Sequence, residues 1–182
     1  MSVSTAKWTI NDYHRMIQVG LLDDRPVELL NGEIVEMSPE GEPHAYYRME
    51  TKDYLTQLLG KRVAIREAAP ITIPASYSEP EPDLAIVQPL GREYLQHHPY
   101  PDNIFWLIEF SNSSLAKDLE VKRQTYAEGN IREYWVRDLP NERLIIFREP
   151  MGGDYASKFT LTRGNISPLA FPDVAVSVEQ LL

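Results

Sequence analysis

Two carboxylic acids in the middle of the sequence are placed where they could act together. Asp83 immediately precedes the apolar run 84–87, and Glu109 immediately follows the apolar run 104–108. Continuous apolar runs of this length are typical of buried strands. If the two strands are antiparallel neighbours, the start of one lies beside the end of the other. Both carboxylates then meet at one edge of the sheet.

A lysine follows these acids at a position where a core side chain is expected. After the second strand, Leu115, Leu119 and Tyr126 mark the inward stripe of a helix. Lys122 lies on the same stripe, and its long side chain could bring the ammonium group back to the sheet edge. The sequence therefore predicts one site formed by both acids and this lysine.

Such a site suits metal-dependent hydrolysis of a phosphodiester. Neighbouring carboxylates repel each other, and a hard cation such as Mg²⁺ or Mn²⁺ keeps Asp83 and Glu109 both ionised. The metal activates water, while Lys122 orients the water or stabilises the charge that builds on phosphorus. The same spacing also fits a buried ion pair, with Asp83 a turn residue after proline. A glycosidase would leave Lys122 without a role, so we rank it below both.

The remaining patterns predict an α/β (α+β) fold around these residues. Helices are expected over 7–22, with Tyr13, Met16 and Ile17 inward, over 44–59, with Tyr47, Met49, Tyr54, Leu55 and Leu58 inward, and from Asn112–Ser114 to Glu128. Strands are expected over 63–66, 71–73, 84–87, 104–108, 131–136, 143–147 and 155–162, with a strand or short helix over 173–182.

The clearest hairpin covers residues 27–37. Asn31-Gly32 suits a type I′ turn between two β-prone runs. A two-residue turn places Glu28 and Glu33 on one face, which we expect to meet water, with a ligand role as the alternative. His44, which opens the next helix, is either a structural hydrogen-bonding group or a catalyst.

The long connection 88–103 contains aromatic residues and two histidines, and is typical of a functional or mobile loop. His97 and His98 are adjacent, so they point in opposite directions on an extended chain and make a poor zinc pair. The aromatic residues Tyr94 and Tyr100 could form the interface of a homodimer.

Composition limits the class of protein. A chain of 182 residues that is 43% hydrophobic is long enough for one core, so we expect a single domain, 1–182. No apolar run reaches the length of about eighteen residues that a membrane span needs, and no secretory leader is visible. Together with the absence of cysteine, these features lead us to expect a cytoplasmic protein without a membrane partner. The net charge of -9 argues against a protein that coats nucleic acid.

The Uma-two family, part of the PD-(D/E)XK, restriction-endonuclease-like superfamily, is similar to residues 9–182. The resemblance lies in Val27-Glu28 to Glu33, His44, Pro82-Asp83, Ile108-Glu109-Phe-Ser111, Asp118, Lys122, Tyr126 and Glu133-Tyr134-Trp135 to Asp138. It implies a restriction-endonuclease-like core, with a central mixed sheet flanked by helices and an added N-terminal helix and β-hairpin.

The resemblance also implies roles. Asp83 and Glu109 would be metal ligands for Mg²⁺ or Mn²⁺, Lys122 the catalytic lysine, and Glu28 and His44 site-adjacent residues. DNA would be the substrate of an endonuclease. The sequence departs from the superfamily at Ser111, where the motif lysine belongs, so Lys122 must replace it from the helix. The alternative is a catalytically inactive member of the fold that acts as a binding or assembly module.

Overall fold

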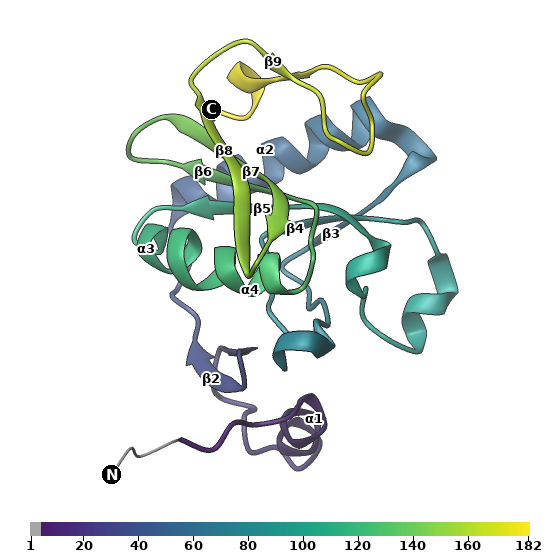
Figure 1. The fold of residues 1–182 in the computed structure, drawn as a ribbon, viewed down its shortest axis with the longest axis vertical. Helices are drawn as coiled ribbons and strands as arrows, with labels where there is room; N and C mark the ends of the chain where they lie inside the picture. The colour runs from purple at the N-terminus through teal and green to yellow at the C-terminus, as the bar shows by residue number, and fades with distance from the viewer. Residues whose placement is uncertain (1–4) are drawn as a thin grey trace.

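The computed structural model describes residues 5–182, and its centre is a mixed sheet of six strands (Figure 1). All neighbouring strands are antiparallel except β5 and β6, which are parallel. The sheet order is β3 (Ala64–Glu67), β4 (Leu84–Val87), β5 (Ile104–Ser111), β6 (Glu133–Asp138), β7 (Arg143–Met151) and β8 (Asp154–Leu161). The prediction of an α/β (α+β) fold with a central mixed sheet is confirmed.

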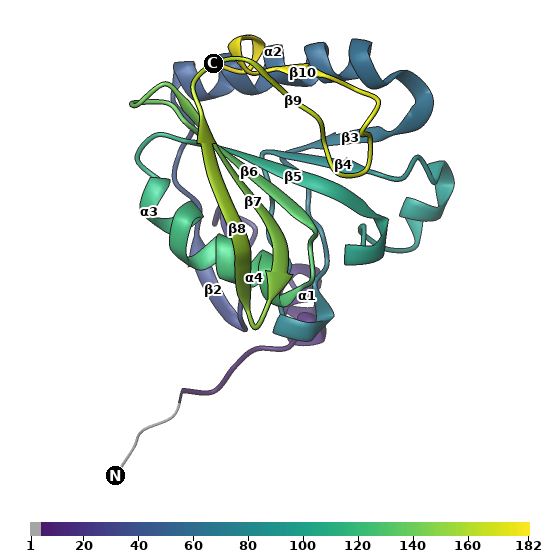
Figure 2. The same ribbon diagram turned by 45° about the horizontal axis from the view of Figure 1, so that its top comes forward.

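Helices cover both faces of this sheet (Figure 2). One face carries α2 (Glu42–Leu59) and the C-terminal segment, which contains β9 (Asn165–Ile166), β10 (Val176–Ser177) and the 3-10 turn η6 (Val178–Gln180). The other face carries α3 (Leu115–Lys117), the π-helical turn η5 (Asp118–Lys122) and α4 (Arg123–Glu128). The expected helix up to Glu128 is therefore present, with a wider turn inside it.

Alternation along β5 decides which side chains meet which helix. Trp106, Ile108 and Phe110 belong to the core beneath α2, whereas Leu107 belongs to the core that includes Tyr126 of α4. Glu109 and Ser111 share the face of Leu107 by the same alternation. The acid at residue 109 is thereby directed toward the helix that carries Lys122.

The N-terminal helix α1 (Ile10–Gln18) begins with a capping box between Thr9 and Asp12. Tyr13 is buried and Met16 packs beside it, as predicted. The prediction for Ile17 is wrong, because this side chain is 46% exposed. The helix packs through one narrow stripe, and Ile17 lies outside that stripe.

The hairpin has the predicted register. β1 (Val27–Leu30) and β2 (Glu33–Glu36) pair Glu28 with Val35 and Leu30 with Glu33, and Asn31 and Gly32 both have the positive φ of a type I′ turn. The expectation that this face meets water is wrong for Glu28, which is 0% exposed, and right for Glu33. The first strand is buried along its whole length, whereas Glu33 and Glu36 of the second strand are exposed.

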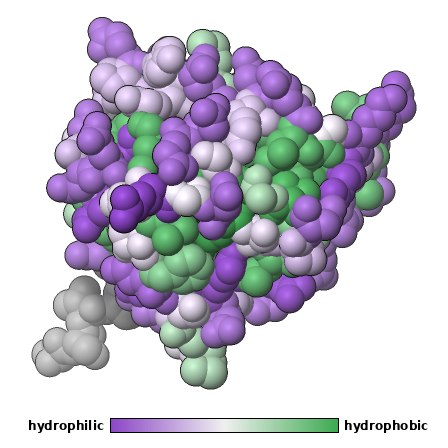
Figure 3. All heavy atoms as spheres, turned by 90° about the horizontal axis from the view of Figure 1, so that it is seen from above, coloured by the Kyte–Doolittle hydropathy of each residue, from purple (hydrophilic) through white to green (hydrophobic). Residues whose placement is uncertain are grey.

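The inner face of α2 differs from the predicted one at two positions. Leu55 is buried and Tyr47 and Tyr54 pack against the core, but Met49 is 50% exposed and Leu58 also points outward. Leu59, which was not predicted, is buried instead. Figure 3 looks down on this side of the molecule and shows hydrophobic atoms exposed among hydrophilic ones.

The connections are mostly irregular. Residues 71–73 were expected to be a strand, but they form only an isolated bridge, Ile73 with Ser78, before the 3-10 turn η2 (Pro74–Ser76). Three further 3-10 turns are η1 (Gly60–Arg62), η3 (Gly91–Leu95) and η4 (Pro101–Asn103), the last two inside the long connection. None of the helices within residues 5–182 has the length and apolar character that crossing a membrane would require.

Candidate functional site

Asp83 and Glu109 lie side by side at one edge of the sheet, as predicted. β4 and β5 are antiparallel neighbours in which Leu84 is paired with Ile108, so the preceding and following acids are brought together. The backbone N–H of Asp83 donates to Oε2 of Glu109 over 3.4 Å. Glu109 does not end its strand, because β5 continues to Ser111.

Lys122 reaches these acids from the helical face. Its Nζ atom lies 2.9 Å from Oε1 of Glu109 and 3.5 Å from Oε2 of Glu28. The hydroxyl group of Tyr126, one turn further along, donates to the same Glu109 oxygen over 2.7 Å. Glu109 is thus held by two donors on one oxygen, and its other oxygen meets only the distant backbone N–H of Asp83.

Burial and neighbouring charges shift the pKa values of Glu109 and Lys122. Burial raises the pKa of Glu109 well above its ordinary value, against the opposing charge of Lys122. Burial alone would lower the pKa of Lys122, but the surrounding carboxylates of Glu109, Glu28, Asp118 and Asp83 raise it. The lysine is therefore an ammonium ion at neutral pH, surrounded by acids.

Asp83 is oriented by an imidazole ring and a backbone amide. Nε2 of His44 lies 3.0 Å from Oδ2 of Asp83, and the N–H of Phe110 donates to the same oxygen over 2.7 Å. Burial would raise the pKa of Asp83, but the hydrogen bond and charge of His44 hold it below its ordinary value. Within residues 5–182, Oδ1 of Asp83 takes part in no hydrogen bond.

Glu28 is a buried acid that holds two lysines. Its Oε1 accepts a hydrogen bond from Lys117 at 2.8 Å, while Lys122 approaches Oε2. Burial would raise the pKa of Glu28, but the charges of Lys122 and Lys117 lower it. Glu28 therefore fixes two cations at one side of the acid pair.

A third buried acid, Asp118, lies beside Ser111, the residue that stands where the superfamily motif has lysine. The hydroxyl groups of Ser111 and Ser114 each donate to Oδ2 of Asp118 over 2.7 Å. Burial raises the pKa of Asp118. These bonds fasten the start of the helical segment to β5.

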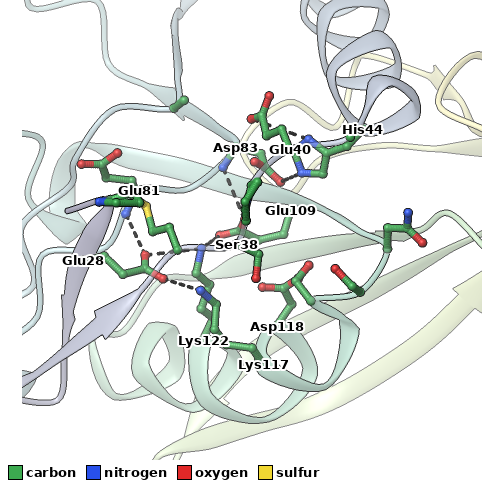
Figure 4. Close-up of a pocket in the computed structure, with 18 residues that line it drawn as sticks. Glu28, Ser38, Glu40, His44, Glu81, Asp83, Glu109, Lys117, Asp118 and Lys122 are labelled. Carbon is green, nitrogen blue, oxygen red and sulfur yellow. Dashed lines mark hydrogen bonds and ion pairs between the residues drawn. The ribbon is translucent and has the colours of Figure 1, made fainter. Parts of the chain in front are cut away.

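All five predicted site residues line one cavity of about 470 Å³. Figure 4 shows the side chains converging from the hairpin, α2, the two strands and the helical segment. The cavity also has acids and a lysine that were not singled out from the sequence as site residues. The charged side chains of its lining are Glu28, Glu40, Glu81, Asp83, Glu109, Asp118, Lys117 and Lys122, with His44 beside them.

One group of side chains has the spacing of metal ligands. Glu40, His44 and Asp83 each offer an atom within 4.8 Å of the others. One sequence feature points to Glu40, which lies four residues before His44 near the start of a helix. Lys117 carried no comparable signal, because a lysine on a helix is ordinarily solvated.

Comparison with known proteins identifies the family of the chain. The family model named Uma2, described as "Putative restriction endonuclease", matches residues 10–179. The crystal structure of a "putative nuclease belonging to DUF820" from Anabaena variabilis ATCC 29413 is similar, with a TM-score of 0.66 and 11% identity, covering 95% of this chain and 96% of that chain. No curated protein matches the chain. Because the family model covers nearly the whole sequence, the chain belongs to the Uma2 family of restriction-endonuclease-like proteins.

Proposed function

We propose that this chain is a metal-dependent endonuclease that hydrolyses phosphodiester bonds of DNA through Asp83, Glu109 and Lys122. The observation that carries the proposal is the 2.9 Å contact between Lys122 and Glu109, beside Asp83 and in the lining of one cavity. Membership of a family described as "Putative restriction endonuclease" supports a nuclease. DNA as the substrate and the residue roles below are parts of the proposal.

Asp83 and Glu109 would hold the metal ion. Oδ1 of Asp83 has no hydrogen bond within the described chain, and Oε2 of Glu109 has only a long one, so each acid keeps an oxygen for a ligand bond. Carboxylate oxygens are the ligands that Mg²⁺ and Mn²⁺ prefer. When bound, such an ion supplies an activated water molecule and a Lewis acid for the phosphate.

Lys122 acts as a cation rather than as a base. Its pKa is raised by the acids around it, so it has no lone pair with which to accept a proton at neutral pH. Its N–H groups can donate to a phosphate oxygen and stabilise the negative charge that increases in the transition state. Glu28 keeps the ammonium group in place, as Tyr126 does for Glu109 and His44 for Asp83.

Cleavage of supercoiled plasmid, linear duplex and single-stranded RNA, each with Mg²⁺, Mn²⁺ or a chelator, tests this function. We expect metal-dependent nicking of DNA that is abolished in Asp83→Asn and Glu109→Gln. Lys122→Met should slow cleavage by roughly 10²–10³-fold. Glu33→Gln and Lys61→Met, exposed residues of the same charge types, serve as matched controls. Cleavage by Asp83→Asn at the wild-type rate would refute the assignment.

A second candidate is a catalytically inactive member of the fold that acts as a binding or assembly module. Negative charge favours this second candidate. The chain has a net charge of -9, and the cavity is lined by six carboxylates and two lysines. A folded protein that binds metal without cleaving any of the three substrates would establish this alternative.

A homodimer also remains a proposal. Of the two tyrosines expected at its interface, Tyr100 is exposed, whereas Tyr94 packs against the core and donates its hydroxyl hydrogen to the carbonyl of Gln88. Tyr100→Glu should shift a dimer toward monomer in sedimentation velocity experiments. A wild-type protein that sediments as a monomer at all concentrations would refute the dimer.

A further inference from the structure

We infer that Glu40, His44 and Asp83 form a second cation position in the cavity, which takes a transition-metal ion such as Co²⁺ or Zn²⁺ in preference to Mg²⁺. The inference rests on the proposed function only because both use Asp83. It concerns a ligand set that includes an imidazole nitrogen, in contrast to the two carboxylates assigned to hydrolysis.

The spacing of the three side chains follows from their elements. Glu40 lies just before α2 and His44 lies in its first turn, so the two side chains are close, with Nδ1 of His44 3.6 Å from Oε1 of Glu40. Asp83 reaches Nε2 of the same ring at 3.0 Å. Neighbouring ligands of an ion with bonds of about 2.1 Å at right angles are themselves about 3 Å apart. One ion binds only one ring nitrogen, and a set with one ligand atom from each residue lies within 4.8 Å, so the side chains would have to draw together around the ion.

A neutral His44 ring cannot interact favourably with both of the carboxylates beside it. A neutral imidazole has one N–H and one lone pair, yet both ring nitrogens face carboxylates. The buried Nδ1 atom has no hydrogen-bond partner within residues 5–182. A positive charge is therefore needed between the ring and the acids, and it is supplied either by a second ring proton or by a metal ion. The ion would satisfy a ring lone pair and both carboxylates together.

The donor set decides which ion fits. Imidazole suits Zn²⁺ and later transition-metal ions such as Co²⁺, whereas Mn²⁺ and Mg²⁺ prefer oxygen ligands, Mg²⁺ in a strict octahedron. Arg48 forms ion pairs with Glu40 and with Glu67. The contact with Arg48 involves Oε1 of Glu40, the oxygen that also faces Nδ1 of His44, so an ion would bind Oε2 or displace the guanidinium group from Oε1.

Nuclear magnetic resonance of the full chain with ¹⁵N-labelled histidine tests the site without nucleic acid. On titration with Zn²⁺, we expect the ring nitrogens of His44 to shift at one equivalent, ahead of those of His14, His97 and His98. In calorimetry, His44→Ala should weaken Co²⁺ binding by more than about tenfold, and by a larger factor than it weakens Mg²⁺ binding. Glu40→Gln provides a second variant should His44→Ala fail to fold.

His97 is a matched control, because it lies 3.7 Å from Glu93, four residues earlier, and belongs to no group of three candidate ligands among residues 5–182. His97→Ala should bind Co²⁺ like the wild type. A His44 ring that stays doubly protonated and does not respond to Zn²⁺ would overturn the inference. Equal Co²⁺ affinity of wild type and His44→Ala would do the same.

The two proposals can fail separately. Glu109→Gln should abolish cleavage but retain the Zn²⁺ response of His44. A wild type that shows this response but cleaves nothing would refute the nuclease and support the cation site. Normal Mg²⁺-dependent cleavage without any response of His44 would leave the nuclease standing and reject the second position.

Discussion

Nζ of Lys122 lies 2.9 Å from Oε1 of Glu109, a contact between the π-helical turn and the central strand β5. Asp118 and Lys122, the first and last residues of that turn, are both buried and both approach the β5 face. Turns of π-helix are rare and frequently occur at functional sites. Here the turn brings a cation to the acid pair from a place outside the superfamily motif.

Removing the charge of Lys122 should destabilise the fold as well as slow cleavage. Lys122→Met leaves the carboxylate of Glu109 buried without its cation, which typically costs about 3 kcal/mol. The double variant Lys122→Met/Glu109→Gln should recover part of the lost stability, because the glutamine at position 109 is neutral and needs no cation. Urea unfolding of the four proteins of the cycle measures the coupling. Strict additivity of the two single changes would show that the contact contributes no coupling energy.

The strand order near the site could be predicted because local rules determine it. The run 84–87 and the run 104–108 are short, apolar and close in sequence, and they pair as neighbours. The turn chemistry of Asn31-Gly32 determines the hairpin register. The burial of Glu28 could not be predicted in this way, because it depends on Lys117 and Lys122, which come from a distant helix.

Glu28 and Glu33 therefore provide a direct comparison on one hairpin. Glu28→Gln removes the charge that holds two lysines and should lower the free energy of unfolding by about 1–3 kcal/mol. Glu33 is exposed and pairs only with Lys7, so Glu33→Gln should leave the unfolding midpoint unchanged. Thermal unfolding followed by circular dichroism measures both. Equal effects of the two changes would contradict the buried ion network.

Lys117 should contribute to binding of the nucleic acid rather than to the chemical step. It is the more exposed of the two lysines in the cavity lining. Lys117→Ala should weaken binding of a duplex oligonucleotide, measured by fluorescence anisotropy with Ca²⁺, and reduce the slope of log affinity against log salt by about one. Lys61→Ala removes an exposed lysine that is absent from the cavity lining and serves as the control. An unchanged salt slope for Lys117→Ala would exclude a phosphate contact.

Buried tyrosines should make the fold sensitive to alkali. Burial raises the pKa of Tyr13 to about 12, whereas the unfolded phenol ionises near 10, so the unfolded state loses the proton first. Stability should therefore fall as the pH rises above about 10, by up to about 1.4 kcal/mol per pH unit for this group. Tyr13→Phe should flatten the decline in urea unfolding between pH 10 and 12. Exposed Tyr46→Phe is the control, and equal slopes for both variants would contradict the assignment.

The helix pattern was sufficient to place Lys122 inside, but not to identify its partners. A lysine that interrupts the stripe of Leu115, Leu119 and Tyr126 signals a buried cation, and this expectation is confirmed. The inward positions predicted for Met49 and Leu58 are wrong because polar and apolar side chains are mixed around the whole circumference of α2. The periodicity of the sequence therefore did not distinguish one face of this helix. Glu40 was not predicted as a site residue because it lies in a loop, where an acid is ordinarily solvated.

Moving the lysine from position 122 on the helical segment to position 111 on β5 tests whether the ammonium group also works from the motif position. Ser111 and Glu109 share one face of β5, and the Ser111 hydroxyl group already donates to Asp118 beside the acid pair. Ser111→Lys alone should destabilise the protein, because a second long cation overpacks the buried space next to Lys122. In Ser111→Lys/Lys122→Met the space is freed, and metal-dependent cleavage should exceed that of Lys122→Met alone. A folded double variant that is no more active than Lys122→Met would show that the ammonium group works only from the helix.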